Sequence, residues 1–391
     1  MLWNGDIMDN FIFNARTKIY FGKGQVDNLP DILNEFGKNV LLVYGGSSIK
    51  KNGIYNQITE RLSEFSVCEL SGVEPNPKIE SVRAGAELAK KKNVDVVLAV
   101  GGGSVIDCAK SIAAGYYYDG DPWDFVKDSS LIGDVLPVVA VLTIAATGSE
   151  MNKNSVISNM ASNEKLCTSS LKFIPRAAIL DPTYTYTVPA YHTAAGVADI
   201  MSHVFENYFK SDMTAGVQDG FSEAILKTCI KYAKKAIDTP DDYEARANLM
   251  WASTMALNGL CGAGKSGSFS CHPMEHELSA FYDITHGVGL AILTPRWFRY
   301  ILSENTVDLF YRYAVNVWGI CDEDKFAAAD KAIDATYAFF EGLGIPMNLS
   351  KLGIDGNKFE IMAKNACANG LSNAYVPLSE NDVVNIFNMC V

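Results

Sequence analysis

The chain has 391 residues, of which 48% are hydrophobic and 20% charged, and its formal net charge is −12. This composition is typical of a folded globular protein, and the length exceeds what one hydrophobic core usually supports, so two domains are expected. The negative charge argues against nucleic acid or an anionic membrane as a partner, because both are polyanions.

The cysteines and the N-terminus predict a cytoplasmic protein. The nine cysteines are scattered and include no C-x-x-C pair, a pattern typical of reduced thiols rather than of a disulfide framework. The first residues lack the basic region and apolar run of a signal peptide. The longest apolar run, 135–146, contains Pro137 and is shorter than the roughly 20 residues of a membrane-spanning helix.

The first half of the chain alternates apolar runs with helical periodicity. The predicted strands are 11–13, 18–21, 39–44, 67–70, 94–100, 135–142, 156–158 and 177–181. The predicted helices between them are 25–36, a segment through 54–61, 79–92 and 105–114. Strands that alternate with helices, with glycines after the strands, predict a Rossmann-like parallel α/β sheet.

The second half has a different pattern, which is helical from Thr193 almost to the end. Its predicted helices are 222–236, 241–258, 326–342 and 357–369. We place the change between 182 and 193. The prediction is therefore a dinucleotide-binding α/β domain over 1–185 and an all-helical, metal-binding domain over 186–391.

A glycine triplet follows the predicted strand 94–100 and precedes a helix. Gly101, Gly102, Gly103 and Ser104 do not form the G-x-G-x-x-G pattern, and a tight strand–helix turn would explain them equally well. The N-terminus of a helix nevertheless offers unpaired N–H groups and a positive dipole end, which suit a phosphate. The flanking strand and helix favour pyrophosphate binding here.

The loop after the predicted strand 39–44 bears on the choice between NAD(H) and NADP(H). An acidic side chain in such a loop accepts hydrogen bonds from the ribose 2′-OH of NAD and repels a 2′-phosphate. Here the strand is followed by Gly45, Gly46, Ser47 and Ser48, then Ile49-Lys50-Lys51, with no acid expected in reach. Backbone N–H groups, hydroxyls and a lysine can all donate to phosphate. We therefore predict a preference for NADP(H) over NAD(H), although a solvated turn is the alternative.

Four of the five histidines lie between 203 and 286, and their spacing indicates a metal site. Asp199 and His203 are four residues apart, as are His272 and His276, and His286 follows ten residues later. Residues four apart on a helix share one face. A carboxylate with imidazoles is a ligand set for one divalent cation such as Fe²⁺ or Zn²⁺.

With these motifs in view, the chain resembles the iron-containing (group III) alcohol dehydrogenases over essentially its whole length. Within that family it is similar to the NADPH-dependent butanol dehydrogenases. The matching elements are Gly101-Gly102-Gly103-Ser104 with Asp107 and Lys110, Ala146-Thr147-Gly148-Ser149-Glu150, Ala195-Gly196 through Asp199 and His203, and His272 through His276 to His286-Gly287. Several separate motifs in the right order make this match specific.

The resemblance implies roles for individual residues. It implies Asp199, His203, His272 and His286 as metal ligands, and it places His276 near the nicotinamide, where we expect a catalytic role. It implies nucleotide contacts at Asn76, Gly101, Gly102, Gly103, Ser104, Asp107, Thr143, Thr147, Ser149 and Lys165. It also implies a homodimer. Pro273 departs from the family pattern, but a proline in the first helical turn costs little, so the departure is harmless if a helix begins near His272.

These observations predict a metal-dependent oxidoreductase that transfers hydride between NADP(H) and a primary alcohol or aldehyde, such as butanol and butyraldehyde, with flux towards aldehyde reduction. A polyol dehydrogenase of the glycerol type and a lyase like dehydroquinate synthase are alternatives on the same scaffold. His272 to His276 also spell H-x-x-E-H, an inverted zinc-peptidase motif with Glu275 as base. A metal-binding protein without enzymatic activity is the last alternative, and it would leave the dinucleotide motifs without a role.

Overall fold

The computed structural model describes residues 8–210 and 214–391, which divide into two compact units. The α/β unit comprises 14–188 and 240–254, and the helical unit comprises the described residues of the remaining stretches. The predicted ranges 1–185 and 186–391 are each continuous, whereas both units are built from separate stretches. Residues 240–254 belong to the α/β unit because Met250 lies in the core of the sheet and Trp251 packs against Phe21, with 5.7 Å between ring centroids.

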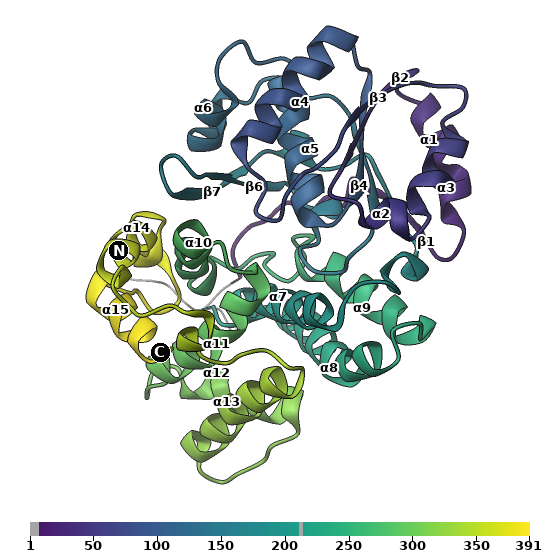
Figure 1. The fold of residues 1–391 in the computed structure, drawn as a ribbon. Helices are drawn as coiled ribbons and strands as arrows, with labels where there is room; N and C mark the ends of the chain where they lie inside the picture. Colours follow the sequence, from purple (N-terminus) through teal and green to yellow (C-terminus); the bar gives the residue numbers. More distant parts are fainter. Residues whose placement is uncertain (1–7, 211–213) are drawn as a thin grey trace. The chain divides into compact units, whose positions relative to one another are not determined.

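The α/β unit is built on a six-stranded sheet with the order β1-β8-β5-β4-β2-β3, in which all neighbours are parallel (Figure 1). Its strands are β1 (Lys18–Phe21), β2 (Asn39–Tyr44), β3 (Ser66–Leu70), β4 (Val96–Gly101), β5 (Val138–Leu142) and β8 (Ala177–Leu180). The four central strands are rich in Val, Leu, Ile and Ala and are almost fully buried. Such continuous apolar runs are expected for parallel strands that are covered on both faces.

Alternate side chains of one strand enter two separate cores. Leu41 and Val43 of β2 pack on one face of the sheet, and Val40 and Leu42 pack on the other. The first face is covered by α4 (Ile79–Lys92), α5 (Gly103–Gly115) and α6 (Pro122–Lys127). The second is covered by α1 (Leu29–Asn34), α2 (Ser48–Lys51) and α3 (Ile54–Arg61). The predicted Rossmann-like sheet is confirmed, and the carboxyl ends of its strands lie on one edge.

Three details of the prediction for this unit are wrong. Residues 11–13 form no strand. The predicted helix 25–36 is a 3₁₀ turn, Gln25–Asn28, followed by the short α1. A strand was also missed, since β6 (Asn154–Asn159) pairs with β7 (Glu164–Ser169) as a separate antiparallel hairpin. Polar residues dominate β7, so apolar periodicity could not reveal it.

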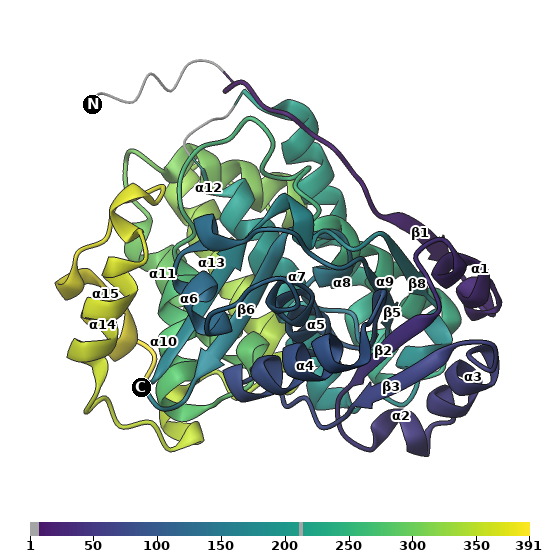
Figure 2. The same ribbon diagram turned by 90° about the horizontal axis from the view of Figure 1, so that it is seen from above.

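The second half is helical, as predicted. Its helices are α7 (Ala190–Tyr208), α8 (Gly216–Asp238), α9 (Tyr243–Ala256), α10 (Cys271–Tyr282), α11 (His286–Ile301), α12 (Val307–Tyr313), α13 (Lys325–Gly342), α14 (Phe359–Ala368) and α15 (Glu380–Asn388). Within the helical unit α7 is buried over nearly its whole length and packs against α8 and α11. In Figure 2 α14 and α15 lie side by side, and α14 also packs on α10.

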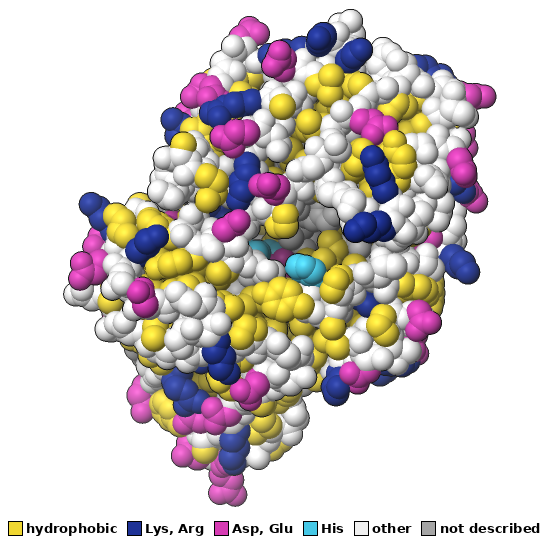
Figure 3. All heavy atoms as spheres, viewed as in Figure 1, with side chains coloured by type: hydrophobic (Ala, Val, Ile, Leu, Met, Phe, Trp, Pro, Cys, Tyr) yellow, Lys and Arg dark blue, Asp and Glu magenta, His cyan; other side chains and the backbone are white. Residues whose placement is uncertain are grey.

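The surface carries charges of both signs. On the face shown in Figure 3, Lys and Arg side chains are interspersed with Asp and Glu, and histidine side chains reach the surface. Among the described residues we find no helix with the length and apolar character needed to cross a bilayer.

Candidate functional site

Helix α7 places a carboxylate and an imidazole in the interior of the helical unit. Asp199 and His203 are four residues apart on this helix and are both almost completely buried. The Nδ1 atom of His203 lies 3.4 Å from Oδ1 of Asp199. The predicted common face is therefore present, and it points into the protein rather than to solvent.

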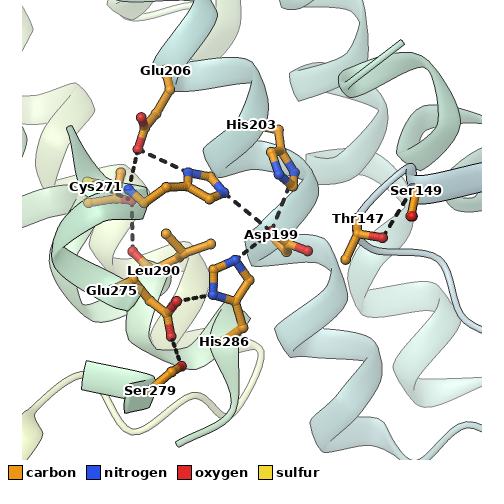
Figure 4. A network of polar contacts seen from close by, with 12 residues as sticks. Thr147, Ser149, Asp199, His203, Glu206, Cys271, Glu275, Ser279, His286 and Leu290 are labelled. Carbon is orange, nitrogen blue, oxygen red and sulfur yellow. Dashed lines mark hydrogen bonds and ion pairs between the residues drawn. The ribbon is translucent and has the colours of Figure 1, made fainter. Parts of the chain in front are cut away.

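The starts of α10 and α11 bring two more imidazoles to the same carboxylate (Figure 4). His272 is the second residue of α10 and His286 is the first residue of α11. Their Nε2 atoms lie 3.9 and 3.7 Å from Oδ1 of Asp199. Pro273 is the third residue of α10, where a missing N–H group costs little. A helix therefore begins near His272, so Pro273 is harmless there.

This arrangement fits a divalent cation. Ligand atoms of Asp199, His272 and His286 all lie within 4.8 Å of one another. Two ligands about 2.1 Å from a shared tetrahedral metal would be about 3.4 Å apart, close to the nitrogen–oxygen separations here. The buried Nε2 of His272 has no hydrogen-bond partner among the described residues. A cation at this point would satisfy that nitrogen.

His203 differs from the other candidate ligands. It lies outside the group whose ligand atoms converge within 4.8 Å, although its ring centroid is 4.5 Å from that of His272. The nitrogen that faces Asp199 is Nδ1, whereas His272 and His286 present Nε2. The structure thus brings three of the four predicted ligands into one cluster and leaves His203 at its margin.

Two buried glutamates support the histidine rings, and sequence reasoning did not identify this role. Glu206 of α7 faces Nδ1 of His272 at 3.1 Å, and Glu275 of α10 contacts Nδ1 of His286. A carboxylate behind a ligand histidine fixes the proton on one nitrogen and leaves the other for the metal. The available signal was Glu206 itself, an acidic residue three positions after His203 and one turn further along the same helix.

The pKa values of His203 and His272 shift in opposite directions. Burial, reinforced by the nearby His272 and His286, holds the pKa of His203 well below its usual value. Burial acts in the same direction on His272, but the carboxylates of Glu206, Asp199 and Glu275 outweigh it, so the pKa of His272 is raised. The lowered pKa therefore favours the neutral form of His203, which is the form that binds a metal.

His276 lies beside the cluster and not within it. Its ring centroid is 5.7 Å from that of His286, and its ligand atoms group with Glu275 and His286 rather than with Asp199. This geometry does not suit the inverted peptidase motif, in which His272 and His276 would be paired ligands and Glu275 a free base. Glu275 instead contacts His286 and accepts a hydrogen bond from Ser279.

Two glycines permit the close packing of the site. A Cβ atom at Gly287 would overlap the backbone carbonyl of Ala195, where α11 crosses α7 one turn before Asp199. A Cβ atom at Gly289 would lie 2.8 Å from Cγ of Glu275. Only glycine at these positions allows α11 to approach closely enough for His286 to reach both carboxylates.

The glycine triplet lies at the carboxyl end of β4 and the start of α5, as predicted. Gly101 ends the strand, Gly102 precedes the helix and Gly103 begins it, and no side chain caps the helix. A Cβ atom at Gly103 would overlap the side chain of Thr147, from the loop after β5. The glycines therefore allow this loop to lie against the helix start, whose first N–H groups have no side-chain cap. Uncapped N–H groups at a helix start suit an anion.

Behind this loop lies a buried polar network that includes two of the predicted nucleotide contacts. Asp107 accepts a hydrogen bond from the hydroxyl of Ser149 and another, at 2.9 Å, from the backbone of Val156. Lys110 is fully buried and donates to Ser149 at 2.8 Å and to the carbonyl of Asn154 at 2.7 Å. Burial lowers the pKa of Lys110 to about 8. In this structure Asp107 and Ser149 hold the loops together.

The remaining predicted nucleotide residues lie in the same unit. Thr143 follows β5 and its N–H group donates to the carbonyl of Gly101 at 3.0 Å. Asn76 occupies the left-handed backbone region, with φ of 50°. Lys165 is buried on β7; burial raises the pKa of Asp107, and the charge of Lys165 adds to the larger opposing effect of Lys110. Ser104 is in the first turn of α5.

An acidic side chain that was not considered in the sequence lies next to the strand that leads into the loop after β2. Glu69 of the adjacent strand β3 accepts hydrogen bonds from Tyr44 at 2.7 Å and from Tyr55 at 2.8 Å. The ammonium group of Lys50 lies over both tyrosine rings, 5.2 and 4.7 Å from their centroids. The sequence could not show this, because Glu69 is brought to the loop by strand pairing.

Lys50 therefore shares its surroundings with a carboxylate. Gly45, Gly46 and Ser47 lead directly into α2, which begins at Ser48. The hydroxyls and backbone of this loop remain compatible with a phosphate, while the glutamate reduces the net positive charge nearby.

Comparison with known proteins identifies the family. Residues 16–182 match the model of iron-containing alcohol dehydrogenases, and residues 193–391 match the C-terminal model of the same family. The chain is 55% identical to NADH-dependent butanol dehydrogenase A of Clostridium acetobutylicum, over 97% of this chain and 99% of that protein. It is 39% identical to the NADPH-dependent aldehyde reductase YqhD of Escherichia coli, over 93% and 95% of the two chains.

A solved structure agrees with these matches. The crystal structure of NADH-dependent butanol dehydrogenase A from Thermotoga maritima superposes with a TM-score of 0.94 and 38% identity, and the match covers 98% of this chain and 99% of that one. Matches of both family models and of close relatives over nearly the whole length leave one assignment. The chain belongs to the iron-containing alcohol dehydrogenase family.

Proposed function

We propose that the protein catalyses the metal-dependent interconversion of a primary alcohol and its aldehyde, with butanol and butyraldehyde as the first substrates to test. The observation that carries this proposal is the convergence of His272 and His286 on Asp199 in a chain of this family. In the reducing direction an aldehyde, a reduced nicotinamide and a proton give the alcohol and the oxidised nicotinamide. The names of the relatives support the substrate class.

The proposed roles follow from the geometry. When bound, a divalent cation would act as a Lewis acid towards the substrate oxygen. Asp199, His272 and His286 would hold it, with His203 as a fourth ligand. Iron and zinc both suit this donor set. His276, partly exposed beside His286, is placed to hold or move a proton near the substrate.

For the nucleotide, we propose that the start of α5 and the loop after β5 bind the pyrophosphate. The support is an uncapped helix N-terminus lined by Gly102 and Gly103. We retain NADP(H) as the preferred cofactor, supported by the small residues and hydroxyls from Gly45 to Ser48. The alternative, NAD(H), is favoured by Glu69 beside this loop and by the name of the 55% identical relative.

Glycerol-type polyol oxidation is the second candidate on this scaffold. Phe269 packs against the ring of His272, 5.3 Å between centroids, and an apolar neighbour of this kind suits an aliphatic aldehyde better than a polyol. A lyase would cause no net oxidation or reduction of the nicotinamide.

One assay separates these possibilities. Purified protein is given NADPH or NADH with butyraldehyde, and separately NADP⁺ or NAD⁺ with butanol or glycerol, each with and without a strong chelator, and nicotinamide absorbance is followed. We expect aldehyde-dependent oxidation of the cofactor that the chelator abolishes and that added Fe²⁺ or Zn²⁺ restores. Absence of any substrate-dependent absorbance change in metal-loaded protein would contradict the proposed redox function.

We also propose that the protein acts as a homodimer in the cytoplasm. Phe11, Ile12 and Phe13 are large apolar side chains that are 49%, 99% and 41% exposed in the single chain, and a second subunit would shield such residues. Sedimentation of the purified protein at several concentrations measures the oligomeric state directly. A monomer at all concentrations would contradict this part of the proposal.

A further inference from the structure

Glu206 contacts the backbone at the start of α10 as well as the ring of His272. It lies on α7, seven residues after Asp199, and is 2% exposed. Its Oε2 atom accepts a hydrogen bond from the backbone N–H of Ser270 at 2.7 Å. Its Oε1 atom accepts one from the backbone N–H of His272 at 2.8 Å and faces the ring Nδ1 of the same residue at 3.1 Å.

These contacts make Glu206 the cap of a different helix. The N-cap residue of α10 is Ser270, and its own side chain forms no capping hydrogen bond. The first N–H groups of a helix need acceptors, and a negative charge is favoured at that end. Glu206 meets both needs from α7. The position of α10 on α7 is thus fixed at the residue that carries the candidate ligand His272.

The same carboxylate also sets the direction of the imidazole. Because a carboxylate accepts, Nδ1 of His272 is the ring nitrogen that donates to Glu206, which leaves Nε2 as the nitrogen that faces Asp199. The backbone and the ring of His272 are held by one group. A shift of Glu206 would therefore move the helix start and the ligand nitrogen together.

Glu275 offers an internal comparison. It contacts Nδ1 of His286 in the same manner, and Ser279, one turn along α10, donates to its other oxygen. Glu275 lies on α10 itself, and the hydrogen bond from Ser279 ties it within that helix. Glu206 instead holds the start of α10 from a different helix.

We propose that Glu206 is a positioning residue that couples the docking of α10 on α7 to metal affinity. This inference rests on the proposed metal site. Carboxylates that support ligand histidines typically change metal affinity by about 10- to 100-fold when removed. Glu206 should show this loss together with a lower stability of the metal-free protein, whereas Glu275 should show the loss of affinity with a smaller change in stability.

The test uses Glu206→Gln, Glu275→Gln and a matched control, Glu277→Gln. Glutamine keeps one acceptor but presents an NH₂ group to the remaining donors, so part of the cap is lost. Glu277 is also a buried carboxylate of α10, but it accepts a hydrogen bond from Asn365 of α14. For each stripped, full-length protein we would measure the dissociation constant for Zn²⁺ by competition with a chromogenic chelator, and the unfolding temperature without metal.

We expect about 10- to 100-fold weaker Zn²⁺ binding for Glu206→Gln and Glu275→Gln, parental binding for Glu277→Gln, and the larger drop in metal-free unfolding temperature for Glu206→Gln. Parental Zn²⁺ affinity in Glu206→Gln, whatever its stability, would overturn the inference. If that variant does not fold, Glu206→Asp replaces it, and parental affinity there is equally contrary. Failure of the parent itself to bind Zn²⁺ would instead overturn the proposed metal site.

Discussion

The candidate sites of the two units are built from different kinds of groups. In the α/β unit the proposed pyrophosphate site consists of backbone and small residues, and the charged side chains Asp107 and Lys110 are buried behind the loops. In the helical unit the charged and imidazole side chains are the site, and they converge on Asp199. An added atom should therefore damage the first site, and a removed side chain should damage the second.

The largest expected effect is the loss of Asp199. Three imidazole nitrogens face its Oδ1 atom, so Asp199→Ala should release the metal. Since polarisation by a metal supplies several kcal/mol, turnover should fall on the order of 10³-fold or more. Elemental analysis and the aldehyde assay check this together. Nucleotide affinity, measured by fluorescence, should stay at the parental value, and a comparable loss of it would break the distinction between the units.

Lys110→Met tests the buried network of the α/β unit. The substitution removes the cation with the largest effect on the buried Asp107, which should cost about 3–5 kcal/mol in the free energy of unfolding. Denaturant titration measures this cost. Lys172→Met is the control, because Lys172 is an exposed lysine that pairs with Asp134, and its loss should cost at most about 1 kcal/mol. Equal effects of the two substitutions would show that the network does not support the loop.

Gly103→Ala tests whether one added methyl group is harmful. A Cβ atom there overlaps Thr147 and displaces the loop after β5, so the dissociation constant for the nucleotide should rise roughly tenfold, by analogy with overpacking costs of 1–3 kcal/mol. Gly133→Ala is the matched control, since open space surrounds that position. Metal content should be unchanged in both. Unaltered nucleotide binding in Gly103→Ala would contradict the proposed pyrophosphate site at the start of α5.

The smallest effects concern cofactor choice. Glu69→Gln removes a carboxylate from the exposed cluster around Lys50 and should raise the kcat/KM ratio of NADPH to NADH by roughly two- to fivefold, the size of a surface charge effect. Gly45→Asp should move that ratio towards NADH. Steady-state kinetics with both cofactors measure this ratio in each variant. A parent that uses both equally, or the absence of a response to Gly45→Asp, would contradict the proposed preference for NADP(H).

The parts that could be predicted from sequence are those with a local signal. Apolar runs such as 39–44 and 94–100 indicated the buried strands, and the spacing of Asp199 and His203 indicated a shared helix face. Glu69 and Glu206 were not foreseen, because each acts across elements that only the fold brings together. The hairpin strand around Lys165 was missed because it is polar. Residues 11–13 were misassigned because an apolar run predicts a strand even where no neighbouring strand pairs with it.

We propose that the cluster around Asp199 is a metal site and that His276 lies outside it. The most direct measurement is the metal content per chain of His286→Ala and His276→Ala, prepared in parallel and assayed for turnover. We predict that His286→Ala contains far less than one metal ion per chain, while His276→Ala retains the parental content and loses turnover. Stoichiometric metal in His286→Ala, or loss of metal in His276→Ala, would contradict this assignment.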